Sequence, residues 1–271
     1  MTASKTLCYS KWKRIKLLVL AKSLLNFNSL AGTLKPDILE LFADFHRGGL
    51  DVKRLNYGVI TLLPKVHDAT KIQQFRSICL LNFLYKWITK TLTIRLENLV
   101  GKLILNSQSA FMKGRNIMNG ILTLHEILHE TKRRNEVGMI LMLDFEKAYE
   151  KVNWDFLFSC LKLWGFCDTW CQWIRMVVSG GTMCVKLNNK EGTYFVSYKG
   201  VRQGDPLSPI LFNFATDCLS RMVRQAQRNG LLCGLANNLI SGGVVILQYA
   251  DDTIICLKDN IDMARNMKLH L

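Results

Sequence analysis

The sequence has few prolines, no closely paired cysteines and no long hydrophobic run, and each absence excludes a class of protein. Only 4 of the 271 residues are proline and 49% are hydrophobic, which excludes a collagen-like, low-complexity or disordered chain. No apolar run reaches the roughly 18 residues of a membrane span, which excludes a transmembrane segment, and we expect no membrane among the partners. This length predicts one large domain or two small ones.

The 9 cysteines are scattered, and no C-x-x-C pair occurs among them. Structural zinc normally takes four ligands, and no histidine stands at finger spacing from a cysteine pair. We therefore interpret the cysteines as reduced core residues of an intracellular protein, in either the nucleus or the cytoplasm.

Acidic residues are scarce in the first half of the chain. Residues 1–137 hold 22 basic and 9 acidic side chains, a net charge of +13, and the whole chain carries +15. A basic folded domain favours a polyanionic partner such as nucleic acid over a mere solubility role for the charge. The acid-free residues 1–35 form an atypical basic segment, for which an amphipathic helix is a simpler interpretation than an organellar presequence.

Hydrophobic periodicity predicts a mixture of helices and strands. Val137–Phe145 is a nearly continuous apolar run, which is typical of a buried central strand, and Asp144 stands near its end. The expected helices cover residues 36–46, 80–100, 117–134, 155–178 and 206–229. The other expected strands cover residues 57–63, a hairpin over 182–199, and two apolar runs over 244–248 and 253–257.

Two adjacent carboxylates, Asp251 and Asp252, stand between the last two predicted strands. Adjacent carboxylates repel each other, and a divalent cation would offset this repulsion; a plain solvent-exposed turn is the alternative. If the strand that ends at Asp144 is a neighbour in the same sheet, Asp144 and Asp251 meet at one edge. Three carboxylates around two Mg²⁺ ions would suit an in-line phosphoryl displacement.

Five sequence motifs follow one another along the chain. The first two are the segments over residues 60–96 and 107–130, and the later three are LDFEKAYEKVNWDFL at 143–157, GVRQGDPLSPILFNF at 200–214 and YADD at 249–252. In this order and spacing they resemble the motifs of reverse transcriptases of the non-LTR (long interspersed element) retrotransposon type, particularly a lineage abundant in plants. YADD and the 143–157 segment resemble the two catalytic palm motifs, and the 200–214 segment resembles the motif between them. Residues 60–96 are similar to the finger motifs, and residues 107–130 are similar to the segment that joins fingers to palm.

The resemblance implies an α+β right-hand fold with a palm β-sheet packed on helices. Residues 36–137 would form the fingers and the fingers–palm connection, and residues 138–271 the palm. It also implies an RNA-directed DNA polymerase that adds dNTPs to a primer 3′-end with two Mg²⁺ or Mn²⁺ ions. The expected partners are an RNA template, a DNA primer and dNTPs, with no obligate protein partner.

Roles for single residues follow from the same resemblance. Asp144, Asp251 and Asp252 would be both the catalytic residues and the metal ligands, the first two binding directly. The nucleotide would be bound by Lys65 and Arg76 at its phosphates, by Phe145 through its backbone, by Tyr149 under the sugar, and by Gln203 and Gly204. Lys113 and Arg115 would contact template phosphates.

The sequence departs from the family pattern at two positions and in its extent. Glu150 stands where the family usually has Asp, and Ser77 where it usually has Pro. The 271 residues include no thumb and no upstream endonuclease domain, so we expect a weak grip on the duplex. Two alternatives stay open: a catalytically inactive remnant that only binds nucleic acid, and another two-metal palm enzyme such as a nucleotidyl cyclase.

Overall fold

The structure is a computed structural model, and it describes residues 31–270. The described residues form two compact units, each made of two separate stretches of chain. The first unit comprises residues 31–94 and 153–208, and the second comprises residues 95–152 and 209–270. The sequence instead predicts one boundary near residue 137, and that division stays a prediction. The predicted N-terminal amphipathic helix lies outside the described residues.

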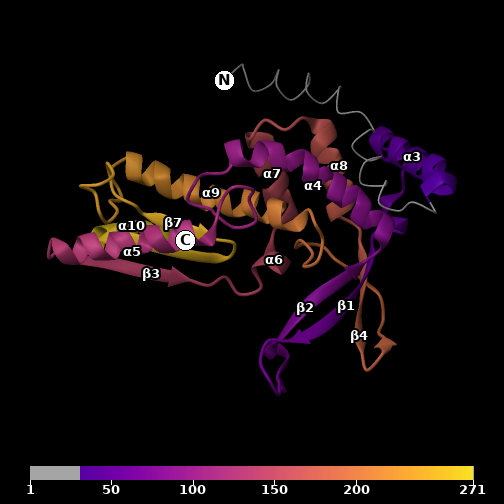
Figure 1. Cartoon of the computed structure of the whole chain (residues 1–271), viewed down its shortest axis with the longest axis horizontal. Coiled ribbons are helices and arrows are strands. Elements are labelled where there is room, and N and C mark those ends of the chain that lie inside the picture. Colours follow the sequence, from indigo (N-terminus) through magenta and orange to yellow (C-terminus); the bar gives the residue numbers. More distant parts are fainter. Residues whose placement is uncertain (1–30, 271) are drawn as a thin grey trace. The chain divides into compact units, whose positions relative to one another are not determined.

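The first unit is built on a sheet in the order β2-β1-β4-β5, with β6 also pairing with β4. β1 (Tyr57–Pro64) and β2 (Phe75–Leu81) form the antiparallel ribbon seen in Figure 1. β1 also pairs in parallel with β4, which continues into the predicted hairpin through Asn188 and Asn189, both at positive φ. The remaining strands are β4 (Thr182–Leu187), β5 (Lys190–Glu191) and β6 (Phe195–Val196).

The helices of the first unit differ from the sequence prediction at two places. α3 (Ala31–Arg47) begins before Pro36, which therefore lies inside the helix, and it ends at Gly48 as predicted. The single helix predicted over 155–178 is wrong, because the chain forms α7 (Trp154–Leu163) and α8 (Asp168–Val178). Gly165 at φ +83° donates to the carbonyl of Lys162, and Phe166 donates to that of Leu161, a Schellman ending that stops α7. This unit also contains residues 83–94 of α4 (Phe83–Leu103) and short 3₁₀ turns at Val52–Arg54 and Ile72–Gln74.

The loop before α9 (Ser208–Arg228) is joined to β2 by backbone contacts. The N–H of Cys79 donates to the carbonyl of Gln203 over 2.9 Å, and Gly204 follows at φ +108°. A Cβ on Gly204 would stand 2.8 Å from the carbonyl oxygen of Cys79, so only glycine fits here. Asp205 is buried next to this loop, where its carboxylate accepts hydrogen bonds from Thr89 and Ser208, and burial raises its pKa.

The second unit is built on an antiparallel sheet in the order β3-β8-β7. These strands are β3 (Gly138–Leu143), β8 (Asp252–Lys258) and β7 (Ile246–Tyr249). The two strands predicted at the C-terminal end are therefore confirmed, and so is the prediction that the strand before Asp144 shares their sheet. The helices are the end of α4 (Phe83–Leu103), α5 (Ile117–Arg133), α6 (Ala148–Lys151), α9 (Ser208–Arg228) and α10 (Ile261–His270).

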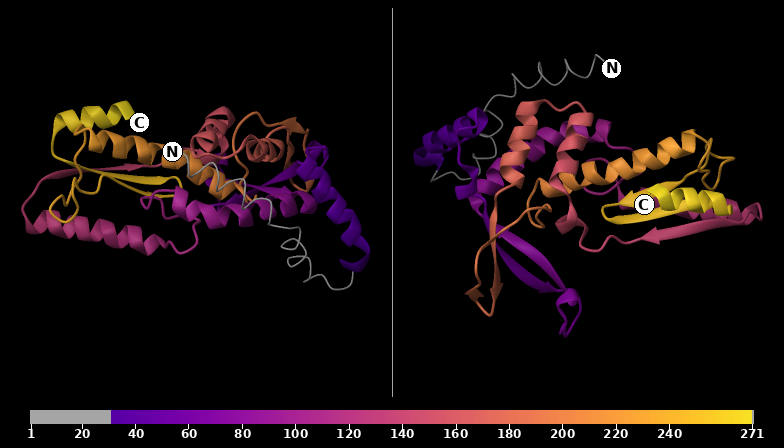
Figure 2. Two further views of the ribbon diagram at one scale, coloured as in Figure 1. Left: turned by 90° about the horizontal axis from the view of Figure 1, so that it is seen from above. Right: turned by 180° about the vertical axis from the view of Figure 1, so that it is seen from behind.

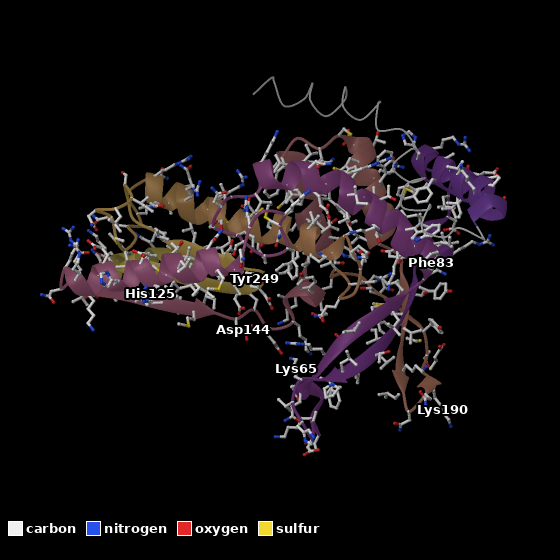
Figure 3. The ribbon with its side chains drawn as sticks, in the orientation of Figure 1. Lys65, Phe83, His125, Asp144, Lys190 and Tyr249 are labelled. Atoms are coloured by element: carbon white, nitrogen blue, oxygen red, sulfur yellow. The ribbon has the colours of Figure 1, made fainter. Side chains whose placement is uncertain are left out.

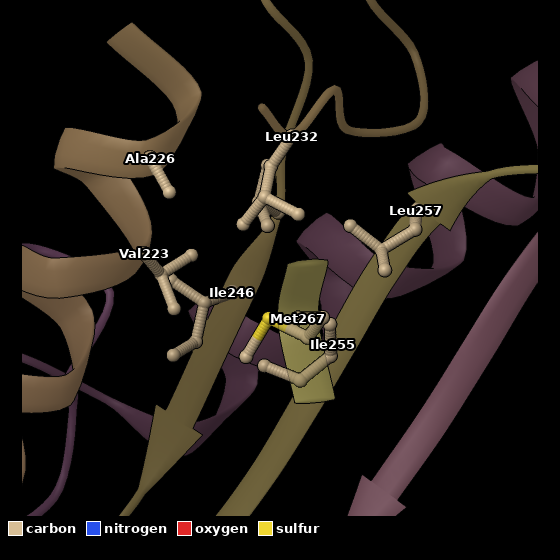
Figure 4. Close-up of a cluster of buried hydrophobic side chains, with 8 residues drawn as sticks. Val223, Ala226, Leu232, Ile246, Ile255, Leu257 and Met267 are labelled. Atoms are coloured by element: carbon tan, nitrogen blue, oxygen red, sulfur yellow. The ribbon is translucent and has the colours of Figure 1, made fainter. Parts of the chain in front are cut away.

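Helices cover both faces of the second unit's sheet (Figure 2). On one face, Val223 and Ala226 of α9 and Met267 of α10 pack on Ile255 and Leu257 (Figure 4). On the opposite face, Ile127 of α5 packs with Leu235 and Cys256, and Ile254 borders this cluster. Successive residues of β8 thus enter different cores, as strand alternation requires.

β3 is an edge strand, and the prediction of a buried central strand is wrong. Among the described residues its hydrogen-bonded neighbour is β8, and no strand pairs with its other side. The exposed fraction is 45% for Leu141 and 73% for Met142. An apolar run predicts burial on both faces, but it carries no information about whether a second strand is available to pair.

The structure also bears on membrane spans and on the cysteines. In the described part of the chain, no helix is long and apolar enough to cross a membrane. The cysteines that the structure describes are free thiols, and five of them are buried: Cys79, Cys160, Cys171, Cys184 and Cys256.

Replacing Gly204 with alanine should destabilise the protein. The change forces a Cβ into a positive-φ conformation and against the carbonyl of Cys79, which should cost about 1–3 kcal/mol in urea unfolding. Gly101→Ala is the control, because a Cβ there would meet nothing within 4 Å and helix propensity favours alanine by about 0.5–1 kcal/mol. Equal effects of the two changes would contradict the packing described for Gly204.

The stability contributed by Glu130 should depend on pH. Its carboxylate accepts two bonds from Arg133 and one from Asn238, and these bonds lower its pKa from 4.5 to about 2. A lowered pKa stabilises the fold fully above the unfolded value, and this contribution is lost as the pH falls through the folded value. Glu130→Gln should therefore destabilise at pH 7 and much less near pH 2, as measured by urea unfolding. The exposed Glu126, changed to Gln, is the control, and a Glu130→Gln effect independent of pH would refute the assignment.

Candidate active site

Three carboxylates gather at one end of the second unit's sheet, and strand register places them. Leu143 of β3 pairs with Thr253 of β8, so Asp144, the next residue, comes level with Asp252. Tyr249 of β7 pairs with Asp252 on the other side, which leaves Ala250 and Asp251 as a two-residue turn. Figure 3 shows Asp144 just beyond the end of β3 and Tyr249 nearby.

The charges of these carboxylates interact. The pKa of Asp252 is raised first by desolvation and then by the negative charges of Asp251 and Asp144. A cation placed among the three groups would relieve that repulsion. The sequence leaves open that Asp251 and Asp252 stand in a plain solvent-exposed turn. The structure agrees only in part, because Asp251 is half-buried and the turn lies beside another carboxylate.

The three carboxylates suit a hard divalent cation that also binds oxygen atoms of the substrate. Carboxylate oxygens are the ligands that Mg²⁺ and Mn²⁺ prefer. Within residues 31–270, no group of three or more His, Cys, Asp or Glu side chains is closed enough to hold a metal ion alone. Mg²⁺ usually binds one or two carboxylates and completes its shell with water and phosphate oxygens, so an open arrangement suits it.

An apolar cavity of about 330 Å³ lies beside the carboxylates, between α5 and the sheet. Its wall includes Ile121 and Leu124 of α5 and Leu247 of β7, and Asp144 and Asp252 stand at its lining. Apolar walls keep water away from one side of the carboxylates, which is consistent with the desolvation that raises the pKa of Asp252.

Tyr149 and Phe145 follow Asp144 along the chain. The ring of Tyr149 stacks on Phe212 of α9, with centroids 4.5 Å apart and planes 12° apart. Burial, followed by the charge of Asp251, raises the pKa of the Tyr149 hydroxyl, so the phenol stays neutral near the carboxylates. Phe145 is exposed, and the nucleotide contacts expected of both residues stay predictions.

Four predicted nucleotide-binding residues lie in the first unit. Lys65 and Arg76 are exposed and close in register, because Leu63 pairs with Arg76 and the N–H of Lys65 donates to the carbonyl of Gln74 over 2.7 Å. Gln203 lies beside β2, because its carbonyl accepts the hydrogen bond from the N–H of Cys79, and Gly204 is the next residue. The structure thus gathers these four residues around β2, and their contacts with a nucleotide stay predictions.

The two predicted template contacts differ in their surroundings. Lys113 is exposed, whereas Arg115 is half-buried and donates to the carbonyls of Gly101, Ile104, Leu105 and Gln108. Burial lowers the pKa of Arg115. Its guanidinium therefore caps the last turn of α4, a structural role that the sequence did not indicate. The phosphate contact predicted for each residue stays a prediction.

The sequence also gave no sign of a buried polar layer under the Ala250–Asp251 turn. Gln108 and Gln248 are 0% and 3% exposed, and both make hydrogen bonds around β7. Most of their partners are backbone groups and hydroxyls from distant parts of the chain, so no local motif marks these two amides.

Comparison with known proteins agrees with this geometry. A family model described as reverse transcriptase (RNA-dependent DNA polymerase) matches residues 63–270. A Xenopus laevis protein named transposon TX1 uncharacterized 149 kDa protein is 29% identical over 86% of this chain, which spans 17% of that relative. A Pol polyprotein from the retrotransposable element R2 of Popillia japonica is 26% identical over 74% of this chain and 27% of its own length.

The fold also resembles solved structures. A Candida albicans telomerase, solved in complex with a fragment of telomeric RNA, matches 79% of this chain and 40% of its own, with a TM-score of 0.55 and 13% identity. At that identity the likeness shows the fold alone, an α+β reverse transcriptase-like arrangement. The retrotransposon relatives agree with the non-LTR type that the motifs predict, while the plant lineage stays a prediction. Because the family model covers most of the sequence, the chain belongs to the reverse transcriptase family of RNA-dependent DNA polymerases.

Proposed function

We propose that this chain carries the catalytic core of an RNA-directed DNA polymerase, which adds dNTPs to a primer 3′-end on an RNA template. The observation that carries this proposal is the β3-β8-β7 register, which gathers Asp144, Asp251 and Asp252 at one end of the sheet. The chain spans less than a third of the two retrotransposon relatives described above, so the activity of this segment needs its own test.

Asp144 and Asp251 would hold the divalent ions, and Asp252 would support them from the adjacent position on β8. When bound, two such ions supply charge stabilisation for the attacking and leaving oxygens of an in-line displacement. The protein's own contribution is to hold the carboxylates at fixed positions on strand ends. The raised pKa of Asp252 is consistent with a site that binds a cation.

The nucleotide and template contacts are proposed by family resemblance, and the exposure of Lys65, Arg76 and Lys113 supports them. Lys65 and Arg76 are exposed on one ribbon, which suits contact with the nucleotide phosphates. Tyr149, stacked on Phe212, would present its ring to the sugar. Exposed Lys113 suits a template phosphate, and the net charge of +15 favours nucleic acid in general.

Asp144→Asn and Asp251→Asn should each abolish primer extension. The rate of extension is measured on an oligo(dT)–poly(rA) substrate with Mg²⁺ or Mn²⁺. The expected loss of rate is about 10³-fold or more, because the ions stabilise the transition state by several kcal/mol. Asp259→Asn, an exposed change beyond β8, should leave extension unchanged.

Three results of that experiment would contradict the proposal in different ways. If the Asp251→Asn variant still extends primers, the carboxylates are not needed for the reaction. Salt-sensitive binding without extension by the parent would make the chain a nucleic-acid-binding remnant. A product that forms without a template would favour another two-metal enzyme.

Tyr149→Ala should reduce the discrimination against ribonucleotides. Removing the ring opens space at the predicted position of the sugar 2′-hydroxyl, so the ratio of rNTP to dNTP incorporation should rise about tenfold or more. The measurement is single-nucleotide extension with each substrate in turn. Tyr149→Phe keeps the ring stacked on Phe212 and should keep the parent ratio. An unchanged ratio in Tyr149→Ala would make this residue a core aromatic only.

A further inference from the structure

One buried amide holds the backbone of the turn that carries Asp251. The side chain of Gln108, 0% exposed, accepts a hydrogen bond from the N–H of Ala250 over 3.0 Å and donates to the carbonyl of Ala250 over 3.2 Å. The same oxygen accepts from the N–H of Ala110 over 3.1 Å, and the same nitrogen donates to the Thr216 hydroxyl over 3.3 Å. Gln108 thereby satisfies both main-chain groups of a single turn residue.

The turn has a backbone conformation that needs such support. Ala250 has φ +55°, a left-handed conformation that a residue with a Cβ rarely adopts without support. Ala250 is also buried, so water does not replace a lost partner of its N–H or C=O. Asp251 is the next residue, and the direction of its carboxylate follows from the backbone of Ala250.

The segment that bears Gln108 is itself fixed beside β7. The N–H of Gln248 donates to the carbonyl of Ser107 over 2.7 Å, and the N–H of Ser109 donates to the carbonyl of Gln248 over 3.1 Å. The side chain of Gln248 accepts from the Ser220 hydroxyl over 2.5 Å. Because both neighbours of Gln108 are bonded to β7, its side chain approaches the turn from one fixed position.

We propose that Gln108 is a positioning residue for catalysis, which acts by fixing the Ala250–Asp251 turn and so the aim of the Asp251 carboxylate. This role rests on the proposed polymerase function. It assigns to the segment between α4 and α5 a part in the geometry of the carboxylates, in addition to any contact with the template.

The test compares Gln108→Met with Gln227→Met in the full chain. Gln227 is a matched control, because its half-buried amide holds another loop of the same unit by donating to the carbonyls of Gly242 and Gly243 over 2.7 and 2.9 Å. Gln108→Met should lower kcat for primer extension and the affinity for Mn²⁺ by about 10–100-fold, as is usual for groups that orient ligands. The KM for dNTP should stay within about twofold. Gln227→Met should lower stability without changing either quantity.

A measurement on the parent protein needs no variant to fold. Hydrogen exchange of the Ala250 amide, followed by NMR, should be at least about 100-fold slower than in an unstructured peptide, because the N–H is bonded to a buried acceptor. The amide should exchange quickly in Gln108→Met and slowly in Gln227→Met.

The outcomes separate this inference from the proposed function. If the parent extends primers and Gln108→Met keeps its kcat, or if both variants lose kcat equally, the positioning role is refuted. Fast exchange of the Ala250 amide in the parent also refutes it. If the parent does not extend primers, the polymerase proposal fails. In that case a Mn²⁺ affinity, measured by electron paramagnetic resonance, that falls in Gln108→Met but not in Gln227→Met supports the positioning role, and equal affinities refute it. A parent that neither extends primers nor binds Mn²⁺ overturns both.

Discussion

The central position of β8 is the constraint on which the carboxylate site depends. β8 bonds to β3 along one side and to β7 along the other, and its alternate residues enter two separate cores. A slip of one residue would exchange Ile255 with Ile254 between these cores and move Asp252 away from Asp144. The packing of α9 and α10 on one face and α5 on the other therefore also fixes the positions of the carboxylates at the strand ends.

The sequence predicted most elements because local patterns determine them. The strands around YADD, the hairpin at Asn188 and the helix over Ile117–Arg133 are all signalled by alternation, turn residues or helical spacing. Two predictions failed where the deciding information is not hydrophobicity. The Schellman ending at Gly165 divides one apolar periodic stretch into two helices, and pairing decides that β3 is an edge strand.

The residues of the candidate site also differ in whether the sequence can predict their role. Asp144, Asp251 and Asp252 stand in short motifs whose strand context is readable, so their gathering at one end of a sheet was predictable. Gln108 and Arg115 act on carbonyls and N–H groups, which every residue has, so no sequence pattern identifies their partners. The resemblance singled out Arg115 for its charge, and the structure shows its guanidinium bonded to the end of α4.

The edge position of β3 also affects the thermal stability of the carboxylate site. Within the described chain, β3 is held by hydrogen bonds to β8 alone, whereas β8 is held on both sides. Local opening of an edge strand takes less free energy than opening of a central one, so β3 should detach while the β7–β8 turn stays folded. Each such event removes Asp144 and leaves Asp251 and Asp252 in place. The arrangement of the three carboxylates should therefore be lost before the fold, and moderate heating should separate Asp144 from Asp251 before it unfolds the unit.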